Sequence, residues 1–267
     1  MQYVKTAAAE KALASGEVDV VTFFCGPLAI QVDKGDPIVL LSGLHPGCVE
    51  LVGTEQIRSI RDLKGKTVAV TDLGGGRHAV LAVMAAHVGI DPRKDINIVE
   101  HPAGEAMRLL AEKKIDGFLA APPDAQQLRA KKIGHVVINT MMDKPWSQYF
   151  CCMVAMNQQF VRKHPVAARK ALRAILKAVD VCAREPERAA RFLVDKGYSN
   201  QYDDALQAMK EMEMGYGKWR NYDPEDTMRF YSLRLHEAGM IKNSPQKIIS
   251  HGTDWRFLRE LKKEMKT

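Results

Sequence analysis

Residues 12–27 read ALASGEVDVVTFFCGP, and their pattern occurs a second time along the chain. The second copy, residues 109–123, reads LLAEKKIDGFLAAPP. Leu13 and Leu110 occupy equivalent positions, an offset of 97 residues (110 − 13). Each copy predicts the end of a helix, a short buried strand and a proline turn, because an apolar run of strand length is bounded by turn-forming residues. After each turn, the pattern predicts another helix, a glycine that ends it and a further strand.

The repeat predicts an α/β protein with two similar lobes. Helices that alternate with strands favour parallel strands joined by crossover helices. Residues 62–70, DLKGKTVAV, predict a turn and a buried strand that begins the second lobe. We expect lobe one to comprise residues 1–52 and 155–267, and lobe two residues 53–154, each with a mostly parallel sheet flanked by helices. After Pro165 the apolar spacing predicts a helical tail that packs on one lobe or braces both.

The composition is that of a globular protein, with 46% hydrophobic and 27% charged residues among 267. The net charge of +7 would suit a nucleic-acid partner, but the basic residues are dispersed among acidic ones in short pairs such as Lys131-Lys132. We therefore expect no nucleic-acid partner. No run approaches the roughly 20 apolar residues of a membrane span. Residues 1–5 lack the pattern of a secretory signal, so we expect either a cytosolic chain or an export signal outside this sequence.

Five cysteines occur, an odd number that cannot form a complete set of intramolecular disulfides. Cys151 and Cys152 are adjacent in an apolar run, and in an extended strand their side chains would point to opposite faces. They could then not hold one metal ion together. We expect all five to be small buried hydrophobic residues, namely Cys25, Cys48, Cys151, Cys152 and Cys182. No metal site, cofactor or redox role is predicted.

Two strand-to-helix turns are the main candidates for a ligand site. In open α/β sheets, ligands bind at the carboxyl ends of strands, and the unpaired N–H groups of helix N-termini suit anions. The glycines of these turns would allow a ligand to approach the backbone, and Arg77 would add hydrogen-bond donors. Alternatively, Gly74, Gly75 and Gly76 form only a flexible turn. No G-x-G-x-x-G or P-loop pattern occurs, so nucleotide binding is not expected. The residues are Phe24, Cys25, Gly26 and Pro27 in the first turn, and Gly74, Gly75, Gly76, Arg77 and His78 in the second.

Further positions are expected to border the same cleft. Pro122 and Pro123 are the second repeat's equivalent of the first turn, and their alternative role is a stiff connection. Trp146 precedes the strand that returns to lobe one and would stack on a planar or apolar ligand, although a lone tryptophan more often belongs to a core. The list is completed by Ser147 and Gln148 as hydrogen-bond donors beside Trp146, and by His45 in the turn at the first crossover.

Four motifs in order carry a family resemblance: residues 12–19, residues 62–70, residues 89–92 (GIDP) and residues 160–165 (FVRKHP). Together they resemble the solute-binding proteins of ABC importers for sulfonates, taurine, nitrate and thiamine-pyrimidine precursors, over essentially the whole chain. The resemblance implies the two-lobed type II fold of periplasmic binding proteins and a small anionic or heterocyclic ligand in the cleft between the lobes. It also implies a membrane permease as partner, a monomer, and a periplasmic or membrane-associated extracytoplasmic location with the signal sequence outside this chain.

The start of the chain departs from the family pattern. Family members usually begin with a strand and a helix that have no counterpart before Gln2-Tyr3-Val4-Lys5, which looks like the strand after that helix. We therefore expect lobe one to lack its first strand and helix. A lobe without them would have a gap in its sheet or pocket.

Two other functions remain open. The fungal thiamine-pyrimidine synthases share the fold, and they carry a longer cysteine-rich run where Cys151-Cys152 stands and a cofactor-holding lysine. In this chain that run contains only two cysteines, and no matching lysine context is evident. No G-x-S-x-G or H-E-x-x-H motif is present either. We therefore expect a receptor rather than an enzyme. A cytosolic sensory domain is the other alternative, but no kinase or DNA-binding segment accompanies the repeat.

Overall fold

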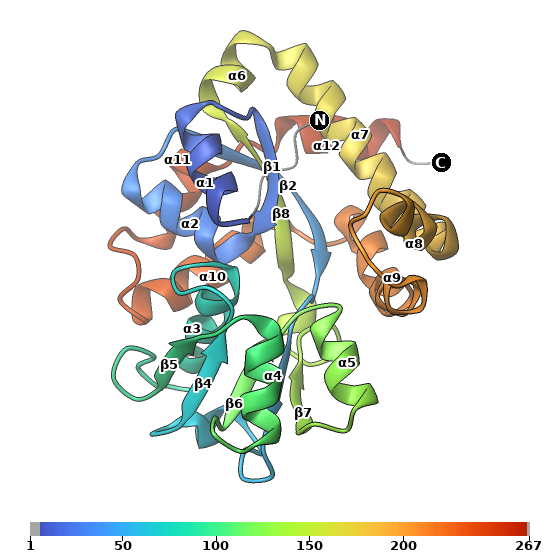
Figure 1. Ribbon diagram of the computed structural model, residues 1–267. Coiled ribbons are helices and arrows are strands. Elements are labelled where there is room, and N and C mark those ends of the chain that lie inside the picture. Colours follow the sequence, from blue (N-terminus) through green and yellow to red (C-terminus); the bar gives the residue numbers. More distant parts are fainter. Residues whose placement is uncertain (1–5, 266–267) are drawn as a thin grey trace.

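Strands form two separate sheets within residues 6–265, the part of the chain that the computed structural model describes (Figure 1). The first sheet has the order β1-β8-β2, with β1 at Val20–Phe24, β8 at Phe150–Asn157 and β2 at Ile38–Pro46. Both pairs are antiparallel, so the expectation of a mostly parallel first sheet is wrong. The reason is that β8 returns from the second sheet and inserts between β1 and β2, which separates the two strands that run in the same direction.

The second sheet has the order β5-β4-β6-β3-β7 and mixed strand directions. Here β4 (Thr67–Val70) pairs in parallel with β5 (Asn97–Glu100) and β6 (Gly117–Ala120), as the alternation of helices and strands predicts. Strand β3 (Glu50–Gly53) is antiparallel to β6 and to β7 (His135–Asn139), because it enters directly from the first sheet without a crossover helix. We call each sheet with its flanking helices a lobe.

Helices cover both sheets, as the sequence predicts. Those of the first lobe that precede the crossover are α1 (Thr6–Ser15) and α2 (Cys25–Lys34). Those of the second lobe are α3 (Gly76–His87), α4 (Ala103–Ala111) and α5 (Asp124–Ala130), with a 3₁₀ turn at Ile60–Leu63. Another 3₁₀ turn, Trp146–Gln148, leads into β8.

A helical tail follows β8 and braces both lobes. Helix α10 (Pro224–Glu237) packs against α2 of the first lobe and α3 of the second, and α9 (Tyr202–Tyr216) packs against β2 and α5. The tail consists of α6 (Gln158–Lys163), α7 (Pro165–Arg184), α8 (Pro186–Asp195), α9 (Tyr202–Tyr216), a 3₁₀ turn (Gly217–Arg220), α10 (Pro224–Glu237), α11 (Pro245–Gly252) and α12 (Arg256–Glu264). Prolines begin α7, α8, α10 and α11, where the missing N–H costs no helical hydrogen bond.

The hydrophobic core runs across the lobes on the side of α2, α3 and α10. One cluster of buried side chains includes Leu28 of α2, Leu81 of α3 and Met228 of α10, all 0% exposed. A smaller cluster lies within the second lobe and includes Leu110 of α4, Phe118 of β6 and Leu128 of α5. Apolar packing thus joins the lobes at α2 and α3.

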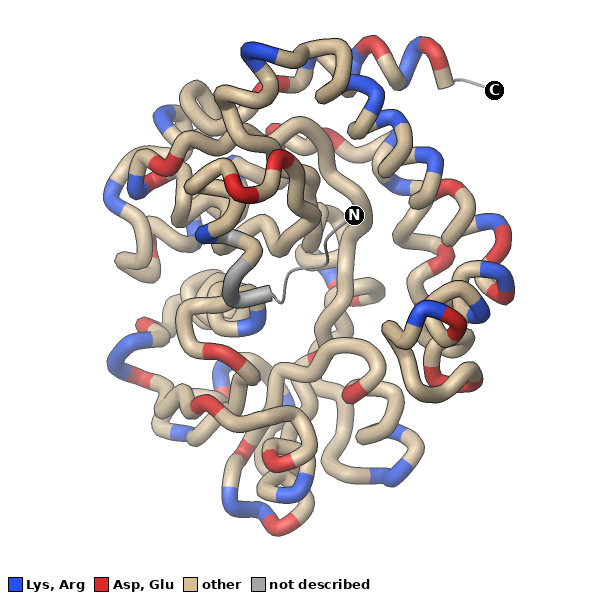
Figure 2. Tube along the Cα trace, turned by 45° about the horizontal axis from the view of Figure 1, so that its top comes forward, with Lys and Arg blue, Asp and Glu red and all other residues tan. Residues whose placement is uncertain are grey.

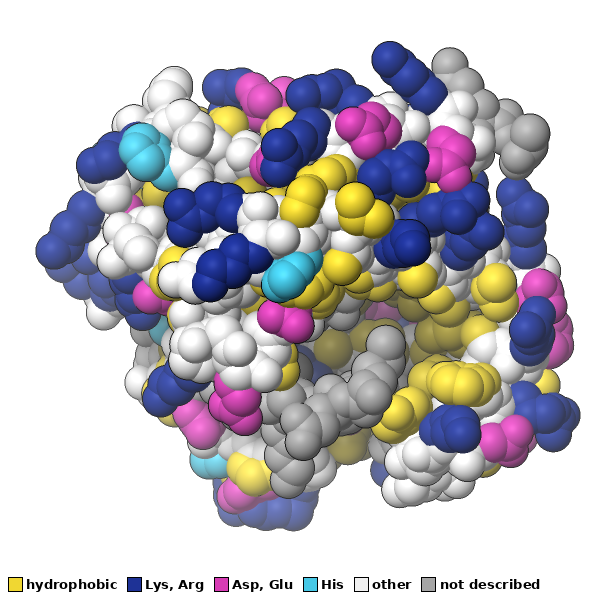
Figure 3. Space-filling view, turned by 90° about the horizontal axis from the view of Figure 1, so that it is seen from above, with side chains coloured by type: hydrophobic (Ala, Val, Ile, Leu, Met, Phe, Trp, Pro, Cys, Tyr) yellow, Lys and Arg dark blue, Asp and Glu magenta, His cyan; other side chains and the backbone are white. Residues whose placement is uncertain are grey.

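Charged side chains are dispersed over the molecule. Figure 2 shows lysines and arginines alternating with aspartates and glutamates along the helices and loops. Seen from above, hydrophobic side chains line a hollow in the surface (Figure 3). Among residues 6–265, no helix has the length and apolar character needed to cross a membrane.

Candidate functional site

The two predicted strand-to-helix turns lie against each other. Gly76, at the start of α3, packs on the ring of Phe24, at the end of β1, so closely that a Cβ atom on Gly76 would lie 2.2 Å from Phe24 Cδ2. A Cβ atom on Gly26 would likewise lie 2.8 Å from the Cβ of Ala79. Real Cβ atoms almost never come this close to a neighbour, so the contact between the lobes requires glycine at both positions.

The polar groups of the second turn are bonded within the chain. The backbone N–H of Gly74 donates to Nδ1 of His78 at 2.8 Å. The guanidinium of Arg77 lies 3.3 Å from a carboxylate oxygen of Asp124, at the start of α5. Burial raises the pKa of the Asp124 carboxyl, and the attraction of Arg77 only partly opposes this. Arg77 therefore links α3 to α5 through Nη1 and Nη2, which both contact Asp124.

A cavity of about 580 Å³ opens between the second lobe and the tail. Its walls come from β3, β7 and α5 on one side and from α9 on the other. Pro122 lines it, and Pro122 and Pro123 also line a neighbouring cavity of about 550 Å³ that reaches the connection between α8 and α9. Of the predicted site residues, these two prolines therefore border the crevice between α5 and α9.

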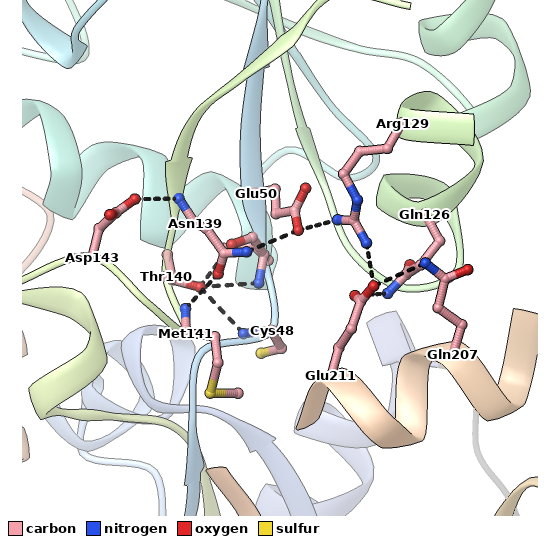
Figure 4. Close-up of polar contacts among 11 residues, drawn as sticks. Cys48, Glu50, Gln126, Arg129, Asn139, Thr140, Met141, Asp143, Gln207 and Glu211 are labelled. Atoms are coloured by element: carbon pink, nitrogen blue, oxygen red, sulfur yellow. Dashed lines mark hydrogen bonds and ion pairs between the residues drawn. The ribbon is translucent and has the colours of Figure 1, made fainter. Parts of the chain in front are cut away.

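A polar network crosses the larger cavity (Figure 4). Arg129 of α5 donates to Glu50 of β3 and to Glu211 of α9, and thus bridges the second lobe and the tail. Asn139 Nδ2 donates to Glu50 Oε1 at 3.0 Å, and Gln126 Nε2 donates to Glu211 Oε2 at 2.7 Å. Burial raises the pKa of Glu50, an effect that outweighs the opposing effect of Arg129.

Two acceptors of this network are buried without a hydrogen-bond partner among the residues that the structure describes. They are Glu50 Oε2 and Gln126 Oε1, and their side chains belong to residues that are 6% and 4% exposed. An unsatisfied buried acceptor costs free energy, so a donor brought to either oxygen would be favourable. The remaining wall is mostly apolar and includes Met141, Met142, Met212 and Met214.

Comparison with known proteins identifies the family. Residues 4–194, more than half of the chain, match the model of the NMT1-like family. The chain belongs to the NMT1-like family. This NMT1-like protein is 27% identical to the nitrate/nitrite binding protein NrtA of Nostoc sp. over 146 residues, 54% of this chain and 33% of the relative. It is 25% identical to the taurine-binding periplasmic protein of Escherichia coli over 190 residues, 68% of this chain and 58% of the relative. The chain thus spans from about a third to under two thirds of these relatives.

Solved structures share the fold of the NMT1-like protein. The periplasmic nitrate-binding protein NrtA of Synechocystis PCC 6803 superimposes with a TM-score of 0.76 at 16% identity, over 99% of this chain and 80% of that one. A putative sulfonate-binding protein SsuA of Methylobacillus flagellatus KT superimposes with a TM-score of 0.71 at 18% identity, over 98% and 81%. The resemblance seen in the sequence, and with it the two-sheet α/β fold, is confirmed.

Several residues predicted for the ligand site of the NMT1-like protein do not line the cavity between α5 and α9. Trp146 is 4% exposed and packs edge-on against His87 and Phe230, so its burial does not fit the predicted stacking on a ligand. Ser147 uses its carbonyl oxygen to accept from the Tyr222 hydroxyl, and Gln148 is exposed. The first turn, Cys25 to Pro27, is buried and already belongs to α2, which begins at Cys25.

Cys25 itself belongs to the core. Its Sγ lies 3.5 Å from Sδ of Met228, and burial raises the pKa of its thiol. Gly75 and Gly74 complete the second turn, where the side chain of Asp72 occupies the space that a Cβ on Gly75 would need. Pro27 is buried and lies in the first turn of α2.

His45 and three cysteines meet where the chain crosses between the lobes. Cys48 forms a disulfide with Cys151, and its Sγ lies 3.7 Å from Sγ of Cys152. The prediction that all five cysteines are buried hydrophobic residues is therefore wrong for these, and Cys182 is only partly buried. The sulfurs of Cys151 and Cys152 both lie beside Sγ of Cys48, although a regular strand would point neighbouring side chains to opposite faces. The pairing of β2 with β8 shifts register here, from His45 opposite Cys152 to Pro46 opposite Phe150, and the irregularity leaves Cys151 unpaired.

The same region contains a potential set of metal ligands. A ring nitrogen of His45 and the sulfurs of Cys48 and Cys152 lie within 4.8 Å of one another. Cys48 is bonded to Cys151, so the set does not offer three free donors in this state. Nδ1 of His45 lies 3.1 Å from the Gly47 carbonyl oxygen, and burial lowers the pKa of the ring.

Sequence reasoning missed the network of Glu50, Arg129 and Glu211. One local signal was available: Glu50 stands in the otherwise apolar run Cys48-Val49-Glu50-Leu51-Val52, and a carboxylate in a buried strand calls for a partner. Arg129 and Glu211 lie 79 and 82 residues from their partners along the chain, and nothing in their own helices distinguishes them from surface charges.

Proposed function

We propose that this NMT1-like protein is the solute-binding receptor of an ABC-type importer and that it holds a small molecule in the crevice between α5 and α9. The observation that carries the proposal is the cavity of about 580 Å³, with one wall from the second lobe and the other from the tail. A ligand that contacts both walls binds the closed arrangement better than an open one, and so favours closure. The relatives named as nitrate-, bicarbonate- and taurine-binding proteins support this function.

The partner would be a membrane permease that recognises the closed form. A match to the nitrate import ATP-binding protein NrtC of Synechocystis sp., 21% identical over 69% of this chain, supports a role in import. We propose that the protein acts outside the cytoplasm and as a monomer. Its moving bodies would be the predicted ones, residues 1–52 with 155–267 and residues 53–154, with the boundaries shifted so that β3 (Glu50–Gly53) stays with the second sheet and β8 (Phe150–Asn157) with the first.

The chemistry of the cavity favours a ligand with N–H donors on an apolar body, such as a small nitrogen heterocycle. Both cations of the wall are engaged, Arg129 with Glu50 and Glu211, and Lys210 with Glu187 at 3.3 Å. Among the buried side-chain atoms of this wall that the structure describes, those without hydrogen-bond partners are the acceptor oxygens of Glu50 and Gln126. An oxyanion would face these acceptors, whereas N–H groups would satisfy them, and the methionine side chains can adapt to a flat apolar ring.

A thermal-shift screen against pyrimidines, sulfonates, nitrate and carboxylates tests the proposal, because a ligand that binds only the folded state raises the melting temperature. Stabilisation by a pyrimidine should weaken in Glu50→Gln and persist in Glu213→Gln. The control residue Glu213 is exposed on the same helix, α9, and is not part of the cavity wall. Stabilisation by an oxyanion alone would contradict the ligand class, and no stabilisation by any class would contradict the receptor function.

Binding without turnover is the expected behaviour. The relatives described above bear the names of binding proteins. The enzymatic alternative requires iron or pyridoxal phosphate, and stoichiometric amounts of either in the purified protein, by metal analysis or absorbance, would favour it over a receptor.

A further inference from the structure

One disulfide joins the two segments by which the chain passes between the sheets. Cys48 lies between β2 of the first sheet and β3 of the second, and Cys151 lies in β8, which leads back to the first. The bond closes a loop of the chain with a sequence separation of 103 residues. It therefore ties together the two crossovers about which the lobes would have to move.

A third sulfur stands beside this bond. Sγ of Cys152 lies 3.7 Å from Sγ of Cys48, although Cys152 follows Cys151 directly in β8. The shift in register between β2 and β8 explains the arrangement, because a regular strand would turn neighbouring side chains to opposite faces. Cys48 is thus within reach of two alternative partners.

We propose that Cys48, Cys151 and Cys152 form a thiol–disulfide exchange site in the hinge, in which Cys48 bonds to either of its two neighbours. The thiolate of Cys152 attacks Sγ of Cys48, a Cys48–Cys152 bond forms, and the Cys48–Cys151 bond breaks. The electron pair leaves with the sulfur of Cys151, which takes up the proton that Cys152 released. The exchange neither gains nor loses electrons, so it needs no oxidant.

The site is open to small thiols and disulfides from outside. Cys48 is half-buried and lines the cavity of about 580 Å³, so a low-molecular-weight thiol can reach its sulfur. Attack by such a thiol forms a mixed disulfide with Cys48 and frees Cys151, and a second thiol then releases Cys48. Cys25 lacks this access because its sulfur is buried against Met228.

The exchange has a structural consequence for the crevice. Cys48 precedes Val49 and Glu50, and all three residues line the cavity. A change of partner from Cys151 to Cys152 moves the anchor of this segment by one residue along β8, and reduction removes the anchor. The redox state of the three sulfurs would therefore alter the wall that carries Glu50.

Serine variants of the folded full chain test the exchange site. Each is incubated with oxidised glutathione at pH 8.5, quenched with acid, alkylated and mapped by mass spectrometry without reduction. The raised pH is needed because burial raises the pKa of the Cys152 thiol to about 12, which leaves little thiolate at neutral pH. We expect Cys151→Ser to form a Cys48–Cys152 disulfide in most molecules, and Cys152→Ser to form Cys48–Cys151. The matched control Cys182→Ser, which removes a free cysteine of α7, should match the parent.

A folded Cys151→Ser protein in which Cys48 and Cys152 are both alkylated would overturn the proposal, as would a mixed glutathione disulfide that persists on Cys48. Circular dichroism establishes that each variant is folded. If Cys151→Ser does not fold, Cys151→Ala and the parent protein, after brief reduction with a dithiol and reoxidation, provide the same readout. A Cys48–Cys152 bond in a fraction of the reoxidised parent supports exchange, and its complete absence contradicts it.

Discussion

Arg129 of α5 and Glu211 of α9 form an ion pair that joins the second lobe to the helical tail. The same guanidinium also binds Glu50, whose side chain is 8% exposed, against 38% for Glu211. Arg129 thus forms ion pairs with one buried carboxylate and one partly exposed carboxylate. The two interactions should differ in their contribution to stability, because solvent screens only the exposed pair effectively.

Removal of Arg129 should destabilise the fold far more than removal of the Glu211 charge. Arg129→Met leaves Glu50 buried without its cation, and we expect a loss of about 3 kcal/mol in the free energy of unfolding. Glu211→Gln keeps a side chain that can accept from Arg129, and we expect a loss of less than about 1 kcal/mol. Urea denaturation measures both. Equal losses in the two variants would show that Glu50 does not depend on Arg129.

Glu50 should make stability fall as the pH rises. Burial raises its pKa above the ordinary value of 4.5, so the folded state holds the proton more tightly than the unfolded state. The contribution is fully present below pH 4.5 and is lost as the pH rises through the raised pKa. Glu50→Gln lacks this loss and should gain stability relative to the parent between pH 4.5 and pH 8, as measured by urea titrations. A constant difference across this range would contradict the predicted shift.

A side chain at position 76 should strain the contact between Gly76 and Phe24. A Cβ atom there would lie 2.2 Å from Phe24 Cδ2, so Gly76→Ala must displace either the ring or the start of α3. We expect a cost of about 1–3 kcal/mol. Phe24→Ala removes the ring and should reduce the additional cost of Gly76→Ala in the double variant.

A double-mutant cycle on melting temperatures distinguishes this steric effect from a backbone effect. Gly104→Ala is the control, because a Cβ there meets nothing within 4 Å and Gly104 lies in α4. Additive effects of Phe24→Ala and Gly76→Ala would show that the two turns do not press on each other.

The sequence was informative where local pattern determines structure. The repeat predicted the first strand-to-helix turn, and the buried strand of residues 62–70 followed by glycines predicted the second; the structure brings Phe24 and Gly76 of these turns into contact. The strand directions of the first sheet were not predictable, because they depend on where β8 inserts, and packing between segments far apart in the chain determines that position. The position of Cys151 and Cys152 was unpredictable for the same reason. In a regular strand their side chains would lie on opposite faces, and only the irregular register with β2 brings both sulfurs near Cys48.

His78 should make the glycine turn sensitive to acid. Its Nδ1 accepts from the N–H of Gly74, and a protonated ring has no acceptor there. Burial lowers the pKa of His78 below the ordinary 6.5, although the charge of nearby Asp72 opposes this, so the folded state favours the neutral ring. The stability from this hydrogen bond is fully present above pH 6.5 and is lost as the pH falls through the lowered pKa.

His78→Ala should therefore lose about 1 kcal/mol at pH 7.5, the contribution of one hydrogen bond, and should lose less further stability than the parent on acidification to pH 5. Urea titrations at both values measure the difference. His45 and His87 also have lowered pKa values, but they remain in both proteins, so their contributions cancel in the comparison. The control variant is His236→Ala, at an exposed position of α10. It should lose as much stability as the parent between pH 7.5 and pH 5. If His78→Ala and the parent lose stability equally between pH 7.5 and pH 5, the Gly74 turn does not depend on a neutral His78.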